Sequence, residues 1–238
     1  MTPSCPPTRS WSISEDSLRR YVQCASENCI QELLSASDST SSNGWTILNL
    51  NNGVEISKLR SPSLHTFRSR HLLRNVSPNQ IASVATAIDA ARQWDPDLVE
   101  AKYMKHLEDN LCIIRLRFGE NAKPLFRNRE FVVYERREAF DDGTFVVAVA
   151  SLPNKIAAGL HPKQSNSIRG FLLMSGWVLE KLQDDSCMVT YVAQVPHRLL
   201  LFIYYFFVLN LYFYFITFIN LIILLLLSVK VFYFFQPT

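Results

Sequence analysis

Apolar residues recur at helical spacing in the first part of the chain. Leu18, Val22 and Ile30 lie on one side of a helix, and polar residues separate them. This pattern predicts an amphipathic helix from near Ser14 to Ser35. The polar run that continues to Asn43 then predicts a loop.

A second helix is predicted to start at Ser77. Serine caps helices, proline suits the first helical position, and Gln80 stands at the third position of a capping box. This helix must end by Trp94, because the residue before Pro96 is pushed out of helical conformation. A short third helix is expected from residues 97 to 105.

The rest of the chain shows strand patterns. Asn51-Asn52-Gly53 is a strong turn signal, and it predicts a hairpin within residues 44–58. A further strand is expected over residues 65–76. β-Branched and aromatic residues then predict five more strands, at residues 111–118, 130–137, 144–152, 169–182 and 187–194. The order indicates an α+β fold in which the last strands form an antiparallel meander within one curved sheet.

The stretch from Leu199 to Phe235 is apolar on all sides. A curved sheet needs helices over its concave face, so an amphipathic helix is expected after the last strand, yet this stretch has no polar face. It exceeds the roughly 20 apolar residues that a membrane-spanning helix needs. It also lacks Ala and Gly, which membrane helices use for packing. Two interpretations stay open: translated non-coding sequence, such as a retained intron, or a C-terminal membrane anchor.

Composition narrows the function classes. A net charge of +3 is too small to indicate nucleic-acid binding, which needs a concentrated basic face. The five cysteines are odd in number and scattered, which is typical of reduced thiols in the cytosol. The N-terminus has no apolar core of a signal peptide. The histidines show no metal-ligand spacing, and no catalytic or phosphate-binding motif is present. We therefore expect no catalytic residues, no metal and no cofactor.

Several short motifs, in this order and spacing, resemble the StAR-related lipid transfer (START) domain family. They are Gly44-Trp45, Asn52-Gly53-Val54, Arg92-Gln93-Trp94-Asp95, Asn128-Arg129-Glu130-Phe131-Val132, Asp142-Gly143-Thr144, Gly176-Trp177-Val178-Leu179-Glu180 and Val189-Thr190-Tyr191-Val192-Ala193-Gln194. The resemblance implies a helix-grip fold, in which a curved antiparallel sheet and a C-terminal helix enclose an apolar tunnel. It also implies one lipid or sterol as the ligand, without catalysis.

The chain departs from the family in two places. Glu130 stands where the family motif has Asp, which keeps the charge and adds one methylene. After Gln194 the chain continues as Val195-Pro196 and then the apolar tail, so the expected lid helix is missing. The predicted organisation is a disordered segment at residues 1–13, a C-terminally incomplete lipid-binding domain at 14–195, and a hydrophobic tail at 199–235.

Candidate ligand-binding residues come from two neighbouring strands. Phe131, Val133, Glu135 and Arg137 share one face of their strand by alternation. The family often keeps an acid and an arginine inside the tunnel on these strands, which implies an interior pair between Glu135 and Arg115 or Arg117. The alternative is that these charges lie on the solvated outer face. The candidate set is Arg115, Arg117, Arg129, Phe131, Val133 and Glu135.

These observations favour a non-catalytic domain that binds and transfers a phospholipid or sterol and contacts a membrane surface. The alternative is a membrane-tethered lipid sensor that uses the tail as its anchor. The expected location is the cytoplasm, with membrane association if the tail is expressed. The residues from Pro153 to Ser167 mix basic and apolar side chains, so they are either a membrane-touching gate or an ordinary surface loop.

Overall fold

The computed structural model describes residues 13–38, 44–51, 53–60, 64–89, 91–94, 98–119, 129–162, 167–183 and 185–196. The predicted disordered segment, apart from Ile13, and the hydrophobic tail lie outside these residues. Within the part of the chain that the structure describes, no helix is long and apolar enough to cross a membrane.

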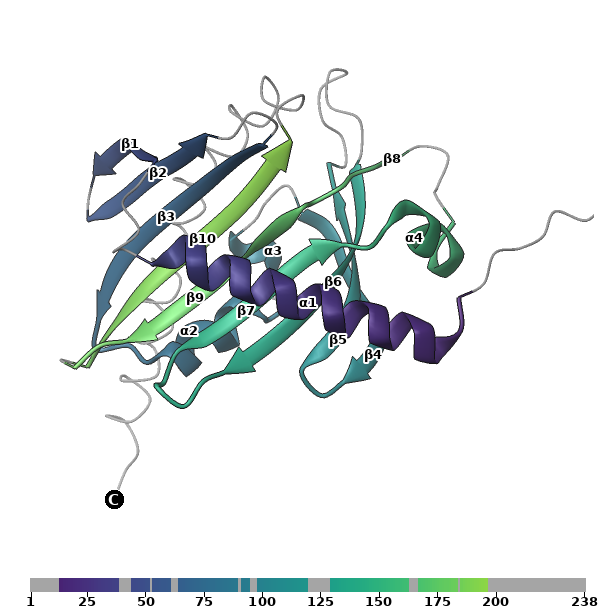
Figure 1. The fold of residues 1–238 in the computed structure, drawn as a ribbon, viewed down its shortest axis with the longest axis horizontal. Helices are drawn as coiled ribbons and strands as arrows, with labels where there is room; N and C mark the ends of the chain where they lie inside the picture. The colour runs from purple at the N-terminus through teal and green to yellow at the C-terminus, as the bar shows by residue number, and fades with distance from the viewer. Residues whose placement is uncertain are drawn as a thin grey trace, which may run out of the picture.

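Ten strands form one curved sheet (Figure 1). They are β1 (Trp45–Asn51), β2 (Val54–Arg60), β3 (Leu64–Arg74), β4 (Leu98–Glu108), β5 (Leu111–Phe118), β6 (Arg129–Ala139), β7 (Phe145–Ser151), β8 (Ile168–Arg169), β9 (Met174–Lys181) and β10 (Ser186–Pro196). The order across the sheet is β1-β2-β3-β10-β9-β7-β6-β5-β4, with antiparallel neighbours, and β8 pairs with β6 in parallel. The predicted meander is confirmed, since strands β4 to β7, β9 and β10 follow one another along the sheet.

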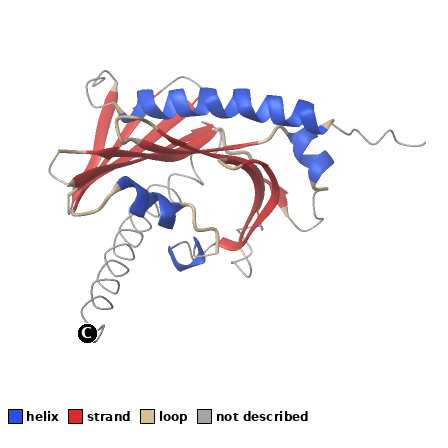
Figure 2. Ribbon diagram, turned by 90° about the horizontal axis from the view of Figure 1, so that it is seen from below, coloured by secondary structure: helices blue, strands red, loops and turns tan. Residues whose placement is uncertain are grey.

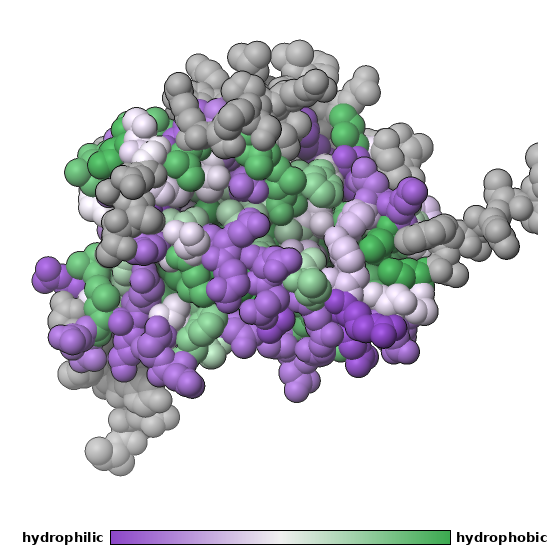
Figure 3. Space-filling model, viewed as in Figure 1, coloured by the Kyte–Doolittle hydropathy of each residue, from purple (hydrophilic) through white to green (hydrophobic). Residues whose placement is uncertain are grey.

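The long helix α1 (Glu15–Ser37) covers the outer, convex face of the sheet (Figure 2). Ser14 caps it by accepting a hydrogen bond from the Ser17 backbone amide. Its apolar stripe is fully buried against the sheet, whereas the charged residues of its other face make part of the hydrophilic surface in Figure 3. At Gly176 of β9, an added Cβ would overlap the backbone carbonyl oxygen of Val147 in β7 and the Leu33 side chain of α1. The backbone of the neighbouring strand therefore requires glycine at this position.

The inner, concave face is partly covered by α2 (Pro78–Ala85). The short helix α3 (Ala91–Trp94) lies on the same side of the sheet. The predicted capping box of α2 is confirmed, because Ser77 and Gln80 cap each other's backbone amides. Ile81 and Ala82 pack into a cluster with β2, β3, β9 and β10. A fourth helix, α4 (Asn154–Leu160), follows β7 and buries Ile156 in the core beneath α1. Much of the predicted loop from Pro153 to Ser167 is thus an ordered helix.

One contact with a cation holds the ring of Trp45, and one contact with an aromatic ring holds that of Trp177. The Arg68 guanidinium lies 4.2 Å from the centroid of the Trp45 ring, and it donates to the Ala36 carbonyl at the end of α1. The rings of Trp177 and Tyr191 lie 4.6 Å apart on the inner face. The side chain of Trp94 lies outside the described part of the chain.

The main error concerns residues 97–105, predicted as a helix. Residues from Leu98 onward form β4, an edge strand paired with β5. Its register shifts at three places, so its buried residues do not alternate strictly and the pattern of a strand is hidden. The second helix also ends early, at Ala85, and the predicted strand at 169–182 is two strands, β8 and β9.

Candidate functional site

One row of paired residues runs across the inner face. Cys112 of β5 lies opposite Glu135 of β6, Glu135 opposite Val149 of β7, and Val149 opposite Ser175 of β9. Directly opposed residues of neighbouring strands point to the same side of a sheet. The row therefore places one carboxylate among small and apolar side chains on the concave face.

Apolar side chains surround this carboxylate. They form a cluster of Cys112, Ile114 and Val133, with Ile88, Tyr103, Leu116, Phe131 and Val149 packed against it. This cluster is separate from the larger core beneath α1. The strands therefore supply two apolar surfaces, one that α1 buries and one that faces the concave side.

Glu135 is paired with Arg137, two residues along the same strand. Nε and Nη2 of Arg137 donate to Glu135 Oε1 at 2.8 and 2.7 Å, and Nη2 also donates to the hydroxyl of Tyr103 at 3.0 Å. Only 10% of the Glu135 side chain is exposed, against 31% for Arg137. A buried charge needs a partner, and here the two charges cancel within one pair.

Burial sets the protonation behaviour of this group. It raises the pKa of Glu135 above the usual value of a glutamate, and the charge of Arg137 opposes that shift. Burial also raises the pKa of the Tyr103 hydroxyl, and it raises the pKa of the Cys112 thiol to about 12. At neutral pH the site thus presents neutral hydroxyl and thiol groups beside one ion pair.

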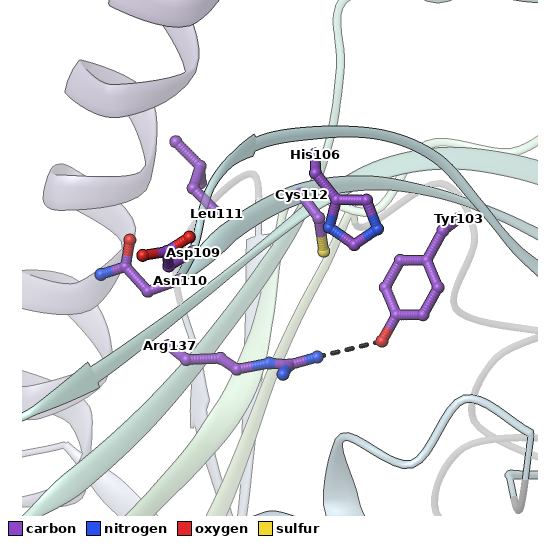
Figure 4. A pocket seen from close by; sticks show the side chains of 7 residues that line it. All are labelled: Tyr103, His106, Asp109, Asn110, Leu111, Cys112 and Arg137. Carbon is purple, nitrogen blue, oxygen red and sulfur yellow. Dashed lines mark hydrogen bonds between the residues drawn. The ribbon is translucent and has the colours of Figure 1, made fainter.

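A pocket of about 140 Å³ opens next to the pair (Figure 4). The residues that line it are Tyr103, His106, Asp109, Asn110, Leu111, Cys112 and Arg137. Figure 4 shows the Arg137 guanidinium reaching toward the Tyr103 hydroxyl, with Cys112 and His106 nearby. Ligand pockets for whole small molecules usually span about 300–1,000 Å³, so this one has room for a polar head group and not for a whole lipid.

The structure divides the predicted site residues between the two faces. Phe131, Val133 and Glu135 lie on the inner face, and strand alternation puts Arg129 there as well. Arg115 and Arg117 lie on the outer face. The predicted pair between Glu135 and one of these two arginines is therefore wrong, since the opposite faces of a sheet keep them apart. Arg137 takes their place.

Arg115 and Arg117 instead belong to an ion-pair cluster around Glu130. Arg115 Nε donates to Glu130 Oε2 at 2.8 Å, Arg169 Nη2 lies 2.8 Å from Oε1, and His161 Nε2 lies 3.2 Å from Oε2. Glu100 bridges Arg115 and Arg117. Glu130 has no exposed surface. The alternative of solvated outer-face charges is right about the face, but Arg115 is buried and paired.

Two residues of the inner site, Arg137 and Tyr103, were not among the predicted candidates. Alternation along β6 places Arg137 on the same face as Glu135, so a signal for it existed. Tyr103 lies in the segment predicted as helix, where no inner face could be assigned. Its contact with Arg137 depends on β4 being a strand.

The sequence model of the START domain matches residues 25–197, which is more than half of the chain. The chain belongs to the START domain family. START domains are lipid-binding and lipid-transfer domains that take a single lipid. No curated protein sequence matches this chain.

Solved structures agree with this START fold. Human StAR-related lipid transfer protein 5 superposes with a TM-score of 0.69 at 18% identity, over 84% of this chain and 95% of that one. Human STARD10 superposes with a TM-score of 0.59 at 18% identity, over 70% of this chain and 66% of that one. A STAR-related lipid transfer protein from Xanthomonas axonopodis superposes with a TM-score of 0.53 at 21% identity, over 65% of this chain and 82% of that one. At these identities the likeness concerns the fold alone.

Proposed function

We propose that this START domain binds one lipid against the concave face of its sheet and transfers it between membranes. The observation that carries the proposal is the ion pair of Glu135 and Arg137, set in an apolar wall beside a pocket of head-group size. An amphiphile matches this arrangement, because its chain or ring system meets the apolar wall while its head meets the polar groups.

The charges of the pair favour an uncharged head group. Glu135 neutralises Arg137 at 2.7 Å, so a lipid phosphate would meet the carboxylate as well as the guanidinium. A hydroxyl can accept from Arg137 and donate to Glu135 at once. A hydroxyl-headed lipid such as a sterol is therefore the proposed ligand class, ahead of an anionic phospholipid.

The proposed role is that of a carrier and not of an enzyme. The one thiol that lines the pocket belongs to Cys112, and its pKa of about 12 keeps it protonated and poorly nucleophilic at neutral pH. Arg137 is held by its carboxylate partner. Four cysteines in the described part of the chain are free thiols, which supports the proposed cytosolic location.

Lipid that copurifies with the full chain tests the proposal. We expect mass spectrometry of extracts to find about one lipid per protein in the wild type, and at least a tenfold lower ratio in Arg137→Met. The matched control is Arg136→Met, the neighbouring residue on the outer face, which should keep the wild-type ratio. Lipid held by the hydrophobic tail would be equal in all three proteins. Equal lipid-to-protein ratios in Arg137→Met and Arg136→Met would refute the proposed site.

A membrane-tethered lipid sensor is the second candidate, and the apolar stretch from Leu199 to Phe235 supports it. Carbonate extraction of membranes separates the two functions. Protein that stays with the carbonate-washed membranes would favour the tethered sensor. Protein recovered in the soluble fraction with bound lipid would favour the carrier.

A further inference from the structure

The shortest strand of the sheet, β8, fills a corner that β7 leaves open. Strand β7 pairs with β6 only as far as Ser151, opposite Val133. Beyond that point the chain leaves the sheet as α4, and it returns as Ile168–Arg169 beside the first two residues of β6. Two residue pairs hold β8 there, against eleven between β10 and β3. Among the described strands, β8 therefore has the fewest backbone pairs to hold it in the sheet.

The Glu130 cluster fastens this corner from the outer face. The carboxylate of Glu130 lies between Arg115, from the strand on one side, and Arg169 of β8 on the other, with 2.8 Å ion pairs to both. Arg169 also donates to the carbonyl of His161 at 2.9 Å. The Arg169 side chain thus connects β8 and the end of α4 to Glu130 of β6.

The same corner closes the inner face. The amide of Gly170 donates to the Glu130 carbonyl at 2.8 Å. Its α-carbon packs so closely on the Phe131 ring that any side chain at position 170 would overlap the ring. Phe131 in turn meets Phe118 edge to face at 5.7 Å. The backbone at Gly170 therefore holds one aromatic side chain of the apolar wall in place.

Two large apolar side chains are exposed beside this glycine. Ile168 is 36% exposed and Phe171 is 45% exposed, at positions that flank Arg169 and Gly170. Exposed apolar residues at the rim of an apolar wall provide a surface along which a lipid chain can pass. This observation does not depend on the ion-pair cluster, and it points to the same corner.

From these contacts we propose that β8 is a gate through which lipid reaches the concave face, and that Glu130 is its latch. The inference rests on the proposed function. Loss of the Glu130 ion pairs raises the population of a state in which residues 168–170 leave β6 and the Phe131 ring is released. Local opening of this kind needs only a small unit of structure to detach, and the rest of the sheet stays folded. Glu130 is thus a positioning residue and does not touch the lipid.

The test measures transfer of a fluorescent sterol between phosphatidylcholine vesicles by the full chain. Glu130→Gln should speed uptake and release by about tenfold or more, because a neutral amide cannot form the ion pairs with Arg115 and Arg169, while equilibrium loading stays within about twofold. Glu138→Gln is the matched control, since Glu138 lies on the same face of β6 and pairs with Arg136 away from β8. Glu130→Asp, which restores the charge, should bring the rates back toward the wild type.

Hydrogen exchange of the Gly170 amide gives a readout that needs no lipid. It should speed up in Glu130→Gln while the β3 and β10 amides keep their protection, whereas a general loss of stability would affect all of them. Wild-type sterol rates and wild-type Gly170 exchange in Glu130→Gln would overturn the gate. Failure of the wild type to load any sterol, with fast Gly170 exchange in the variant, would overturn the proposed function, and the lipid gate with it.

A cross-link keeps the proposal testable if Glu130→Gln fails to fold. Arg129 and Ile168 are paired across β6 and β8, so the double variant Arg129→Cys, Ile168→Cys can join the two strands. Oxidation should slow sterol transfer at least tenfold, and a reductant should restore it. Oxidised wild type is the control for Cys24, which is exposed. Transfer that is unchanged by the completed cross-link would overturn the gate.

Discussion

Two of the three glutamates of strand β6, Glu130 and Glu135, lie five residues apart on opposite faces of the sheet. Glu130 faces outward, has no exposed surface, and is enclosed by Arg115, Arg169 and His161. Glu135 faces inward and has one partner, Arg137, whose other side borders a pocket. A carboxylate enclosed by two arginines and a histidine from several elements ties those elements together. A carboxylate with one partner and an open pocket beside it has capacity left for a ligand.

The largest expected effect comes from removing the enclosed carboxylate. Glu130→Ala leaves two buried arginines without their main partner, and the free energy of unfolding should fall by about 3–5 kcal/mol. Urea denaturation measures it. Glu138→Ala, whose side chain is 32% exposed, should cost less than about 1 kcal/mol. Equal losses in the two variants would contradict the difference between the two glutamates.

Removing the inner carboxylate should affect binding more than folding. Glu135→Gln keeps the shape of the side chain and removes its charge, so sterol affinity should fall by about tenfold, because hydrogen bonds to a charged group are stronger than those to a neutral amide. The free energy of unfolding should change less than in Glu130→Ala, because Arg137 is 31% exposed and can reach water. Fluorescent sterol titration and urea denaturation give the two numbers. Unchanged sterol affinity would place the ligand elsewhere.

A smaller effect is expected from Tyr103→Phe. The change removes the hydroxyl that accepts from Arg137 at 3.0 Å and leaves the ring in the apolar wall. Such a hydrogen bond is worth about 0.5–1.5 kcal/mol, so sterol affinity should fall about threefold. Titration with the same sterol probe measures it. An affinity loss as large as that of Glu135→Gln would make Tyr103 a direct ligand of the head group.

The smallest effect is a pH dependence of stability that comes from Glu135. Burial raises the pKa of folded Glu135 above its ordinary value of 4.5, so the folded state holds a proton that the unfolded state has lost. Its contribution to stability is therefore full below pH 4.5 and is lost as pH rises through the folded pKa. The wild type should lose stability relative to Glu135→Gln over that window. A constant difference between the two proteins would contradict the burial of Glu135.

Much of the fold could be predicted from the sequence, because its signals are local. The Asn-Gly turn, the Ser-Pro start of α2 and the alternation in β5 and β6 each depend on neighbouring residues. Strand β4 could not be predicted, since its bulges obscure the alternation and pairing with β5 decides its conformation. The division of the strand predicted at residues 169–182 also depends on distant partners, because β8 pairs with β6 whereas β9 pairs with β7 and β10.

The candidate site could be predicted in part. Alternation along β6 correctly grouped Phe131, Val133 and Glu135. The partner of Glu135 was wrong because family resemblance located the strands without fixing the register to one residue, and a shift of one residue moves a side chain to the other face. For Arg115, a register shift of one residue decides whether the side chain points into the tunnel or joins the Glu130 cluster on the outer face.

The most direct test of lipid binding on the concave face is photo-cross-linking of a photoactivatable sterol to the full chain, with mass spectrometry to locate the attachment. Our account predicts attachment to inner-face residues of β5 and β6, such as Ile114 and Val133. It also predicts that excess unlabelled sterol and Arg137→Met suppress the cross-link. Attachment confined to the outer face of α1 or to the hydrophobic tail, with no effect of Arg137→Met, would contradict it.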